Sequence, residues 1–423
     1  MKVSVKSGKP CEKILNIEVD QDAVQKEYDL FYRHIAPQAK IPGFRPGKAP
    51  RNVLETHYAH EARERVLKNL ISDSFKEALQ DSALHPLLYP KIQDVDFSGN
   101  RLTYKAHIEV RPKIKLSRVK GLSAKKESAE VKDDEINEEL KRLQESLVQF
   151  KAIEDRPSQM GDVVIADYRC VVDGKEIDKR TDDWLEIKED AFLKDFTNQL
   201  IGLKAGDKRE AQVVLPENLG RKELAGKTAV FHVEVKDLKA KILPEINDDL
   251  AKETGEHNTL AELKEKIRKE ALARKEREKE AAYETALLED LMKHNKIDLP
   301  EGLVQKRLEY LLEDAKKGFL NQGAPEAEFE KQKEKLTAGM EPEAKKQVHL
   351  AFLLDEIAIQ ENIRVEDSDL NERFEQMAVR VKQPVEKVRE FYQTNENARE
   401  SLAEQVRNEK TISYIKQHAK QKR

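Results

Sequence analysis

The chain has 423 residues, and this length predicts about two to four domains rather than one compact core. Lysine and arginine number 77 against 81 acidic residues, so the formal net charge of −4 excludes a strongly basic, histone-like protein but not a local basic patch. The two cysteines, Cys11 and Cys170, lie in segments expected to belong to different domains, which excludes a disulfide framework or a zinc-type cysteine spacing and fits a reducing compartment.

Neither a membrane span nor a secretory signal is expected. No run approaches the roughly 18 apolar residues that a spanning helix needs, and the first residues lack the continuous apolar stretch of a signal peptide. We therefore expect a cytoplasmic protein with no membrane partner.

Residues 1–112 are predicted to form a small α+β domain. An opening strand is followed by a helix capped by Asp20 or Asp22, and a second, amphipathic helix is expected over residues 51–79. Strict alternation of apolar and polar residues over 102–110 predicts a half-buried strand.

Residues 113–150 change in composition to a basic, extended piece followed by a charged helix that begins at Asp133. Such a segment is typical of a linker.

Residues 151–243 have the pattern of a β domain. Apolar and polar residues alternate over 164–172 up to an Asp173-Gly174 turn, and again over 229–235. A short amphipathic segment over 191–201 lies between them, so we expect an antiparallel sheet wrapped around one short helix.

Residues 244–423 are almost entirely helical by pattern. The longest helix is expected to begin at a capping box formed by Thr259 and Glu262 and to end near Asn295. Further helices are predicted over 300–320, 326–336, 342–360, 369–381, 385–392 and 397–417.

Many of these helices combine a narrow apolar stripe with a heavily charged back, so they cannot bury all of their apolar surface against one another. We expect most of the apolar side chains in the core and some of them along an open groove. The candidates are Leu303, Leu311, Phe319, Leu320, Leu350, Phe352, Leu353, Leu354, Ile357, Phe374, Met377, Phe391 and Tyr392.

Enzymatic constellations are missing from the sequence. It has no P-loop, no Gly-rich dinucleotide fingerprint, no HExxH, no GxSxG and no CxxC. His57 and His60 stand three residues apart without a third ligand, so a surface pair explains them better than a metal site. We therefore expect no cofactor and no metal.

The most specific local signal is the segment Gly43-Phe44-Arg45-Pro46-Gly47-Lys48-Ala49-Pro50. Its prolines forbid a helix and its glycines permit tight turns, so it must be an exposed, partly stiffened loop. The surrounding residues 30–54 contain no acidic residue but include the bases Arg33, Lys40, Arg45, Lys48 and Arg51.

An aromatic beside an arginine at a loop tip is suited to docking, because the ring supplies apolar area and the guanidinium engages a carboxylate or phosphate. The alternative is an ordinary proline-rich connection. Nucleic-acid binding by this loop alone is disfavoured, since it lacks a broad basic face and stacking aromatics.

The loop resembles the G-F-R-x-G-x-x-P signature of the trigger factor family of ribosome-associated bacterial chaperones, and it matches every fixed position. The order of segments along the whole chain resembles that family as well. The resemblance implies a ribosome-binding set of Gly43, Phe44, Arg45, Gly47, Lys48 and Pro50. Pro46 stands where the family often has lysine, which removes one charge from the contact.

Residues 151–243 resemble an FKBP-type prolyl isomerase domain, opening at Gly161-Asp162 and closing over residues 226–231. Rotation about an X-Pro bond needs no nucleophile, and an apolar aromatic pocket lowers its barrier by desolvating the imide. The resemblance implies an apolar prolyl pocket formed by Tyr168, Ile177, Trp184, Phe196, Leu219 and Phe231.

This pocket departs from the family pattern. Ile177 replaces a usual phenylalanine, Leu219 replaces a usual tyrosine hydroxyl, and Lys194-Asp195 replace a usual Pro-Gly. We therefore expect reduced isomerase activity. The alternative from residue types alone is that Tyr168, Phe196 and Phe231 are simply core residues of a small sheet.

The resemblance implies an ATP-independent chaperone with partners of two kinds. One is the large ribosomal subunit near the exit tunnel, through ribosomal protein and rRNA, and the other is the unfolded nascent polypeptide. A prolyl isomerase acting as a free folding enzyme is the alternative. A periplasmic-type chaperone is disfavoured by the missing signal sequence and by the loop, and self-association away from the ribosome is left open.

Overall fold

The computed structural model describes residues 1–45, 47–98, 101–189, 193–216 and 224–422. The chain divides into two compact units, one made of residues 1–127 together with 280–423 and the other of residues 128–279. The predicted fold class is confirmed: a small α+β N-terminal part, an FKBP-like antiparallel sheet with a short helix, and a long helical C-terminal part.

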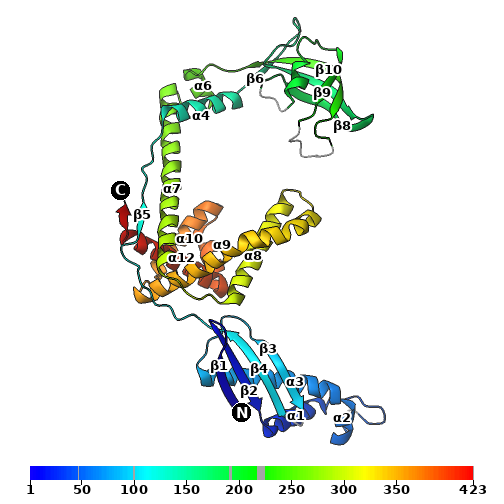
Figure 1. The fold of residues 1–423 in the computed structure, drawn as a ribbon, viewed down its shortest axis with the longest axis vertical. Helices are drawn as coiled ribbons and strands as arrows, with labels where there is room; N and C mark the ends of the chain where they lie inside the picture. The colour runs from blue at the N-terminus through cyan, green and yellow to red at the C-terminus, as the bar shows by residue number, and fades with distance from the viewer. Residues whose placement is uncertain (46, 99–100, 190–192, 217–223, 423) are drawn as a thin grey trace. The chain divides into compact units, whose positions relative to one another are not determined.

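The N-terminal part is an antiparallel sheet covered by helices (Figure 1). Its strands follow the order β1 (Lys2–Ser7), β2 (Glu12–Val19), β4 (Arg101–Glu109) and β3 (Lys91–Ser98). Helix α1 (Gln21–Ile35) begins at Asp20, whose carboxylate accepts a hydrogen bond from the backbone N–H of Ala23, as the capping prediction requires. Buried side chains of the sheet pack against those of α1 and α3 (Ala59–Ser82). The core they form includes Leu15, Ile17, Leu102 and Tyr104 from the sheet and Val24, Val66 and Leu70 from the helices.

The single helix predicted over 51–79 is instead two helices, α2 (Arg51–His57) and α3, separated at Tyr58. Tyr58 has φ −107° and ψ 18°, which is not helical. The break brings Tyr58, Leu54 and Ala62 onto one small apolar cluster beside the loop that precedes α2.

The helical part comprises the end of α7 (Leu260–His294), α8 (Glu301–Asn321), α9 (Glu326–Gln360), α10 (Asp367–Val381), α11 (Val385–Thr394) and α12 (Glu396–Gln417). The separate helices predicted over 326–336 and 342–360 are one continuous helix, so this prediction was wrong. Pro342 lies inside α9 and supplies no N–H to the preceding turn. Ala344 and Val348 pack against α8, and this contact holds the helix together past the proline.

Residues 114–125, within the segment expected to be a linker, are packed into the helical part. Leu122 is fully buried and Ala124 is 5% exposed in a cluster with α7, α9 and α12, and β5 (Ser123–Lys125) pairs in parallel with β11 (Lys420–Lys422). This basic, extended segment packs against the helices because its apolar residues pack into their core. They are Ile114, Leu116, Val119 and Leu122.

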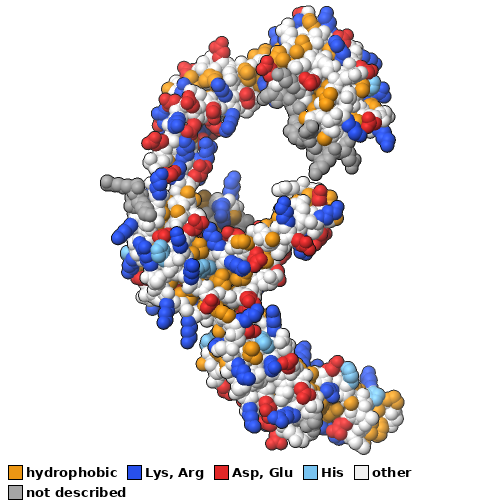
Figure 2. All heavy atoms as spheres, viewed as in Figure 1, with side chains coloured by type: hydrophobic (Ala, Val, Ile, Leu, Met, Phe, Trp, Pro, Cys, Tyr) orange, Lys and Arg blue, Asp and Glu red, His pale blue; other side chains and the backbone are white. Residues whose placement is uncertain are grey.

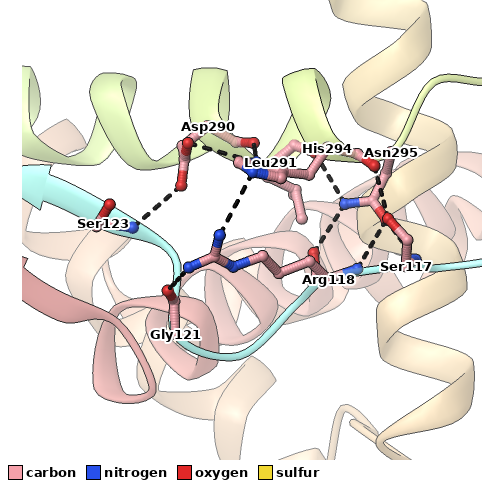
Figure 3. Close-up of polar contacts among 8 residues, drawn as sticks. All are labelled: Ser117, Arg118, Gly121, Ser123, Asp290, Leu291, His294 and Asn295. Atoms are coloured by element: carbon pink, nitrogen blue, oxygen red, sulfur yellow. Dashed lines mark hydrogen bonds and ion pairs between the residues drawn. The ribbon is translucent and has the colours of Figure 1, made fainter.

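Asn295 fastens the same segment to the end of α7 (Figure 3). Its side-chain oxygen accepts hydrogen bonds from the N–H groups of Ser117 (2.7 Å) and Arg118 (3.2 Å), while its amide nitrogen donates to the carbonyls of Arg118 and Leu291, both at 2.8 Å. Asn295 is 3% exposed, so these bonds satisfy the polar atoms of a side chain that is almost wholly removed from water.

The second unit contains a curled antiparallel sheet in the order β6 (Gln149–Ala152), β10 (Thr228–Ile242), β7 (Asp162–Val172) and β8 (Lys175–Glu186), with β9 (Lys208–Val214) also paired to β10. Asp173 and Gly174 both have positive φ at the β7–β8 turn, as a tight hairpin requires. The short helix α5 (Lys194–Asn198) covers the inner face of the sheet.

The remainder of this unit is helical. Helix α4 (Asp133–Ser146) packs Ile136 and Leu140 against the apolar stripe of α7, Leu263 and Ile267, close to α6 (Asp248–Glu253). Thr259 caps α7 by accepting from the N–H of Glu262 at 3.2 Å, whereas the Glu262 carboxylate accepts from Asn258 rather than from Thr259. On the face drawn in Figure 2, positive and negative side chains are interspersed, in keeping with the near balance of charge in the sequence.

Candidate functional site

The loop between α1 and α2 is anchored at its base and exposed at its tip. Ala39 and Ile41 are 4% and 8% exposed in the cluster that includes Tyr32 and Leu54. Residues 42–45 and 47–48 are all exposed, and the Phe44 ring is 42% exposed. Pro46 lies outside the described residues.

Two turns shape the tip. Gly43 has φ +87° and Gly47 has φ +79°, a region that side chains disfavour. The N–H of Phe44 donates to the carbonyl of Ile41 at 3.1 Å, and the N–H of Lys48 donates to that of Arg45 at 2.9 Å. Pro50 then provides the start of α2 with φ −65°. These turns hold Phe44 and Arg45 outward on a fixed base.

The basic residues around the loop fall into two groups. Arg51 pairs with Asp29 at 2.9 Å and with Glu55 at 2.5 Å, and its guanidinium lies 4.3 Å from the centre of the Tyr32 ring, so its charge is used within the domain. Within the described part of the chain, no carboxylate forms an ion pair with the other bases of the stretch, which are Arg33, Lys40, Arg45 and Lys48. The exposed tip therefore carries uncompensated positive charge.

In the β domain, three aromatic side chains proposed for the prolyl pocket meet on the inner face of the sheet. The centres of the Phe196 and Phe231 rings are 4.3 Å apart, and Tyr168 lies 5.9 and 5.8 Å from them. Phe196 and Phe231 are only 4% and 5% exposed, so they also belong to the core, while Tyr168 is half-buried at its edge. Phe196 and Phe231 are therefore core residues, and a prolyl pocket at this cluster stays a prediction.

The surroundings of Tyr168 raise the pKa of its hydroxyl. The pKa of Tyr168 is raised to about 12, mainly by burial and in smaller part by the nearby carboxylates of Asp178 and Asp183, while Arg180 opposes the shift. The hydroxyl is thus a neutral hydrogen-bond donor at any physiological pH. Arg180 lies directly across the strand pair from Tyr168, a placement that follows from a register shift in β8. The alternation of apolar and polar residues in the sequence does not predict that Arg180 faces Tyr168.

The other expected pocket residues are not part of this ring cluster. Ile177 packs against the edge of the same core, and Leu219 lies outside the described residues. Trp184 is on the outer face of the sheet, 49% exposed and edge to face with Phe150.

The candidate groove residues of the helical part are divided between core and surface. Leu353, Leu354, Ile357 and Phe374 are buried. Leu320 and Phe391 are 41% and 54% exposed. The remaining candidates are half-buried: Leu303, Leu311, Phe319, Leu350, Phe352, Met377 and Tyr392.

One hollow of about 650 Å³ in this part is lined by Leu303, Tyr310 and Phe352 together with Arg307 and Arg407. Its lining also includes Lys306, Asp355 and Glu404, and Asp355 pairs with Arg407 at 2.6 Å, so the rim carries charges of both signs. The apolar floor suits an apolar side chain.

Among the described residues, no cluster of three or more His, Cys, Asp or Glu side chains could hold a metal ion, and none of their helices is long and apolar enough to cross a membrane. Cys11 and Cys170 are free thiols. His60 lies 3.8 Å from Glu64 on the surface of α3.

Comparison with known proteins covers nearly the whole chain. Residues 1–143 match the family model "Bacterial trigger factor protein (TF)", residues 259–417 match its C-terminal model, and residues 154–236 match "FKBP-type peptidyl-prolyl cis-trans isomerase".

Two relatives illustrate the similarity. The trigger factor of Geotalea daltonii is 35% identical over 98% of this chain and 96% of its own length. That of Geobacillus kaustophilus is 34% identical over 97% of both chains.

A solved structure described as "Promiscuous Substrate Recognition in Folding and Assembly Activities of the Trigger Factor Chaperone" has the same fold, with a TM-score of 0.52 and 23% identity over 99% of each chain. The family models and the full-length relatives together show that this chain belongs to the trigger factor family of chaperones and carries an FKBP-type domain in its middle.

Proposed function

We propose that the protein is an ATP-independent cytoplasmic chaperone that docks on the large ribosomal subunit near the exit tunnel and shields nascent polypeptides. In this proposal residues 1–112 dock, residues 151–243 are the prolyl isomerase domain and residues 244–423 bind clients. Residues 113–150 connect these parts, although residues 114–125 are packed into the helical core.

The observation that carries the docking proposal is the exposed tip of the loop. Phe44 offers a half-exposed ring, and Arg45 beside it forms no ion pair with any described carboxylate. A ring and a guanidinium held on a stiff base lose little conformational freedom on binding, so most of their contact energy is available for affinity. Gly43, Gly47 and Pro50 shape the tip, and Lys48 adds charge suited to rRNA phosphate or an acidic ribosomal protein.

Replacement of both Phe44 and Arg45 by alanine is expected to abolish co-sedimentation with ribosomes. The matched control is Tyr89→Ala with Lys91→Ala, an exposed aromatic and an exposed base in the same α+β domain, where Tyr89 is 98% exposed. We expect the control to sediment like the unmodified chain. Unchanged sedimentation of the loop variant, with its circular dichroism intact, would refute the docking assignment.

Client binding is proposed for the half-buried and exposed apolar side chains of the helical part. The hollow lined by Leu303, Tyr310 and Phe352 is the candidate that we favour, since its apolar floor suits an apolar side chain. Self-association away from the ribosome would use the same apolar surface and is kept as part of the proposal.

A second candidate activity is prolyl isomerisation, and the cluster of Tyr168, Phe196 and Phe231 favours it. We expect the full chain to accelerate a proline-limited refolding reaction weakly. Tyr168→Ala should remove most of the acceleration and Tyr168→Phe should retain part of it, because the ring stays and only the hydroxyl is lost. A rate equal to the uncatalysed one for the unmodified chain would exclude this activity while leaving ribosome docking untouched.

A further inference from the structure

Trp184 is the only tryptophan of the chain, and it does not lie in the core of its domain. Its ring is 49% exposed and meets the Phe150 ring, itself 42% exposed, edge to face with centres 5.1 Å apart. The Lys239 ammonium sits 4.5 Å from the centre of the Trp184 ring. These three residues form what we call the aromatic platform.

Strand register explains why the platform faces outward. Trp184 on β8 is paired directly with Ile165 on β7, and paired residues share one face of a sheet. Ile165 lies between Val164 and Ala166, both fully buried on the inner face. The platform therefore lies on the side of the sheet away from Tyr168, Phe196 and Phe231.

Such an exposed pair is unusual in this sequence. Aromatic residues make up 6% of the chain and charged residues 37%. Even so, the rings of Phe150 and Trp184 contact each other while both are about half-exposed to solvent. Aromatic side chains bury about 150–250 Å² each when covered, and they are enriched at the anchoring points of interfaces. The exposure of both rings therefore indicates a binding surface, because covering their apolar area with a partner would stabilise the complex.

The strand that carries Phe150 also offers free backbone groups. β6 stands at the end of the strand order β6-β10-β7-β8, and all four of its residues, Gln149 to Ala152, are exposed. A strand at the edge of a sheet presents N–H and C=O groups on one side that another extended segment can pair with. Side chains of such an added strand would alternate, with every second one directed toward the platform.

Two lysines lie near the platform, and only one of them, Lys241, forms an ion pair with a described carboxylate. Lys241 pairs with Glu186 at 2.5 Å, and one oxygen of Asp237 accepts from the N–H of Leu238 at 2.9 Å. No ion pair joins Lys239 to a carboxylate in the described part of the chain. An acidic side chain two residues from an apolar one, on the same face of the added strand, therefore suits this surface best.

We propose that the outer edge of the β domain is a second binding surface for unfolded polypeptide. An extended segment pairs with the backbone of β6 and places a large apolar side chain on Phe150 and Trp184. The surface is distinct from the docking loop and from the proposed prolyl pocket, and it rests on the proposed function only in that its occupant is an unfolded chain.

Because the chain has a single tryptophan, its fluorescence reads this surface directly. The probe is the peptide acetyl-Thr-Glu-Thr-Phe-Thr-Glu-Thr-amide, which contains neither tryptophan nor proline and places its phenylalanine and both glutamates on one face of the strand, titrated into the full-length protein. We expect a saturable change in Trp184 emission, which the same peptide with serine in place of phenylalanine does not produce. A peptide N-methylated at alternate backbone positions should bind at least about fivefold more weakly, since it cannot pair with β6.

Variants of the protein make the test specific. Phe150→Ala is expected to weaken the peptide about fivefold, and Phe150→Tyr should restore most of the affinity. The loop variant with Phe44 and Arg45 replaced by alanine should bind the peptide like the unmodified chain, so failure here and failure of ribosome docking are distinguishable. The proposal is overturned by the absence of a saturable signal, by equal affinity of a folded Phe150→Ala chain, or by equal binding of the N-methylated peptide.

Discussion

Asp162 is a buried carboxylate at the start of β7, 4% exposed, and three hydrogen bonds hold it there. It accepts from Arg156 Nη1 at 2.5 Å, from Arg156 Nη2 at 2.8 Å and from the N–H of Gln159 at 2.8 Å. The Arg156 hydrogen bond lowers the pKa of Asp162, and it outweighs the burial that acts in the opposite direction.

The lowered pKa sets the pH at which this site stabilises the fold. Because the folded pKa lies below the unfolded value of about 3.9, the stabilisation is present above about pH 4 and is lost as the pH falls through the folded pKa. Asp162→Asn is therefore expected to lower the free energy of unfolding of the β domain by about 2 kcal/mol at pH 7, with a shrinking difference below pH 4. Urea unfolding followed by Trp184 fluorescence measures this.

Asp155→Asn is the matched control, since Asp155 is exposed and makes no ion pair with a described residue. It should leave the urea midpoint unchanged. Equal losses for Asp162→Asn at pH 7 and at the lowest pH where the domain still folds would contradict the electrostatic explanation.

Single residues also show where sequence reasoning reaches its limit. The exposed loop tip could be predicted, because Gly and Pro restrict the backbone whatever surrounds them. The position of Trp184 could not, because register shifts in β8 decide which face each residue occupies, and a shift by one residue exchanges the faces. Arg180 opposite Tyr168 depends on the same shift.

Among the elements, α9 shows how packing overrides a local signal. Pro342 forbids one hydrogen bond of the helix, and this suggested a break, yet α9 runs from Glu326 to Gln360. The apolar residues after the proline continue the face that α8 covers, so the tertiary contact outweighs the local cost.

Pro342→Ala restores the missing hydrogen bond, and we expect it to raise the free energy of unfolding of the helical part by about 2 kcal/mol. Pro325→Ala is the control, because Pro325 precedes the first turn of the same helix and interrupts no hydrogen bond there. Urea denaturation followed by circular dichroism at 222 nm measures the free energy of unfolding of both variants. If Pro342→Ala were no more stable than Pro325→Ala, the proline would not be straining the helix.

Part of the segment 113–150 is buried although its composition predicts a linker. A basic, extended composition predicts a linker, and it takes tertiary contacts to show that Leu122 is fully buried and that Asn295 holds the backbone beside it (Figure 3). The four apolar residues spaced along 114–122 were the available signal.

In the molecule as a whole, the exposed loop between α1 and α2, the aromatic cluster of the β domain and the groove candidates belong to different apolar clusters. A substitution at the loop tip therefore changes no packing in the other two parts. The order of the parts and their fold classes were predictable from composition and periodicity. The assignment of residues 114–125 to the helical core was not, because it depends on contacts between segments far apart in sequence.

The most direct test of ribosome docking places a photoreactive amino acid at position 44 and, as a control, at position 89 of the full-length chain. After mixing with purified ribosomes and irradiation, we predict a crosslink from position 44 to a large-subunit protein or rRNA and none from position 89. Crosslinks of equal yield from both positions, or none from position 44 while the chain still co-sediments, would contradict the loop as the point of attachment.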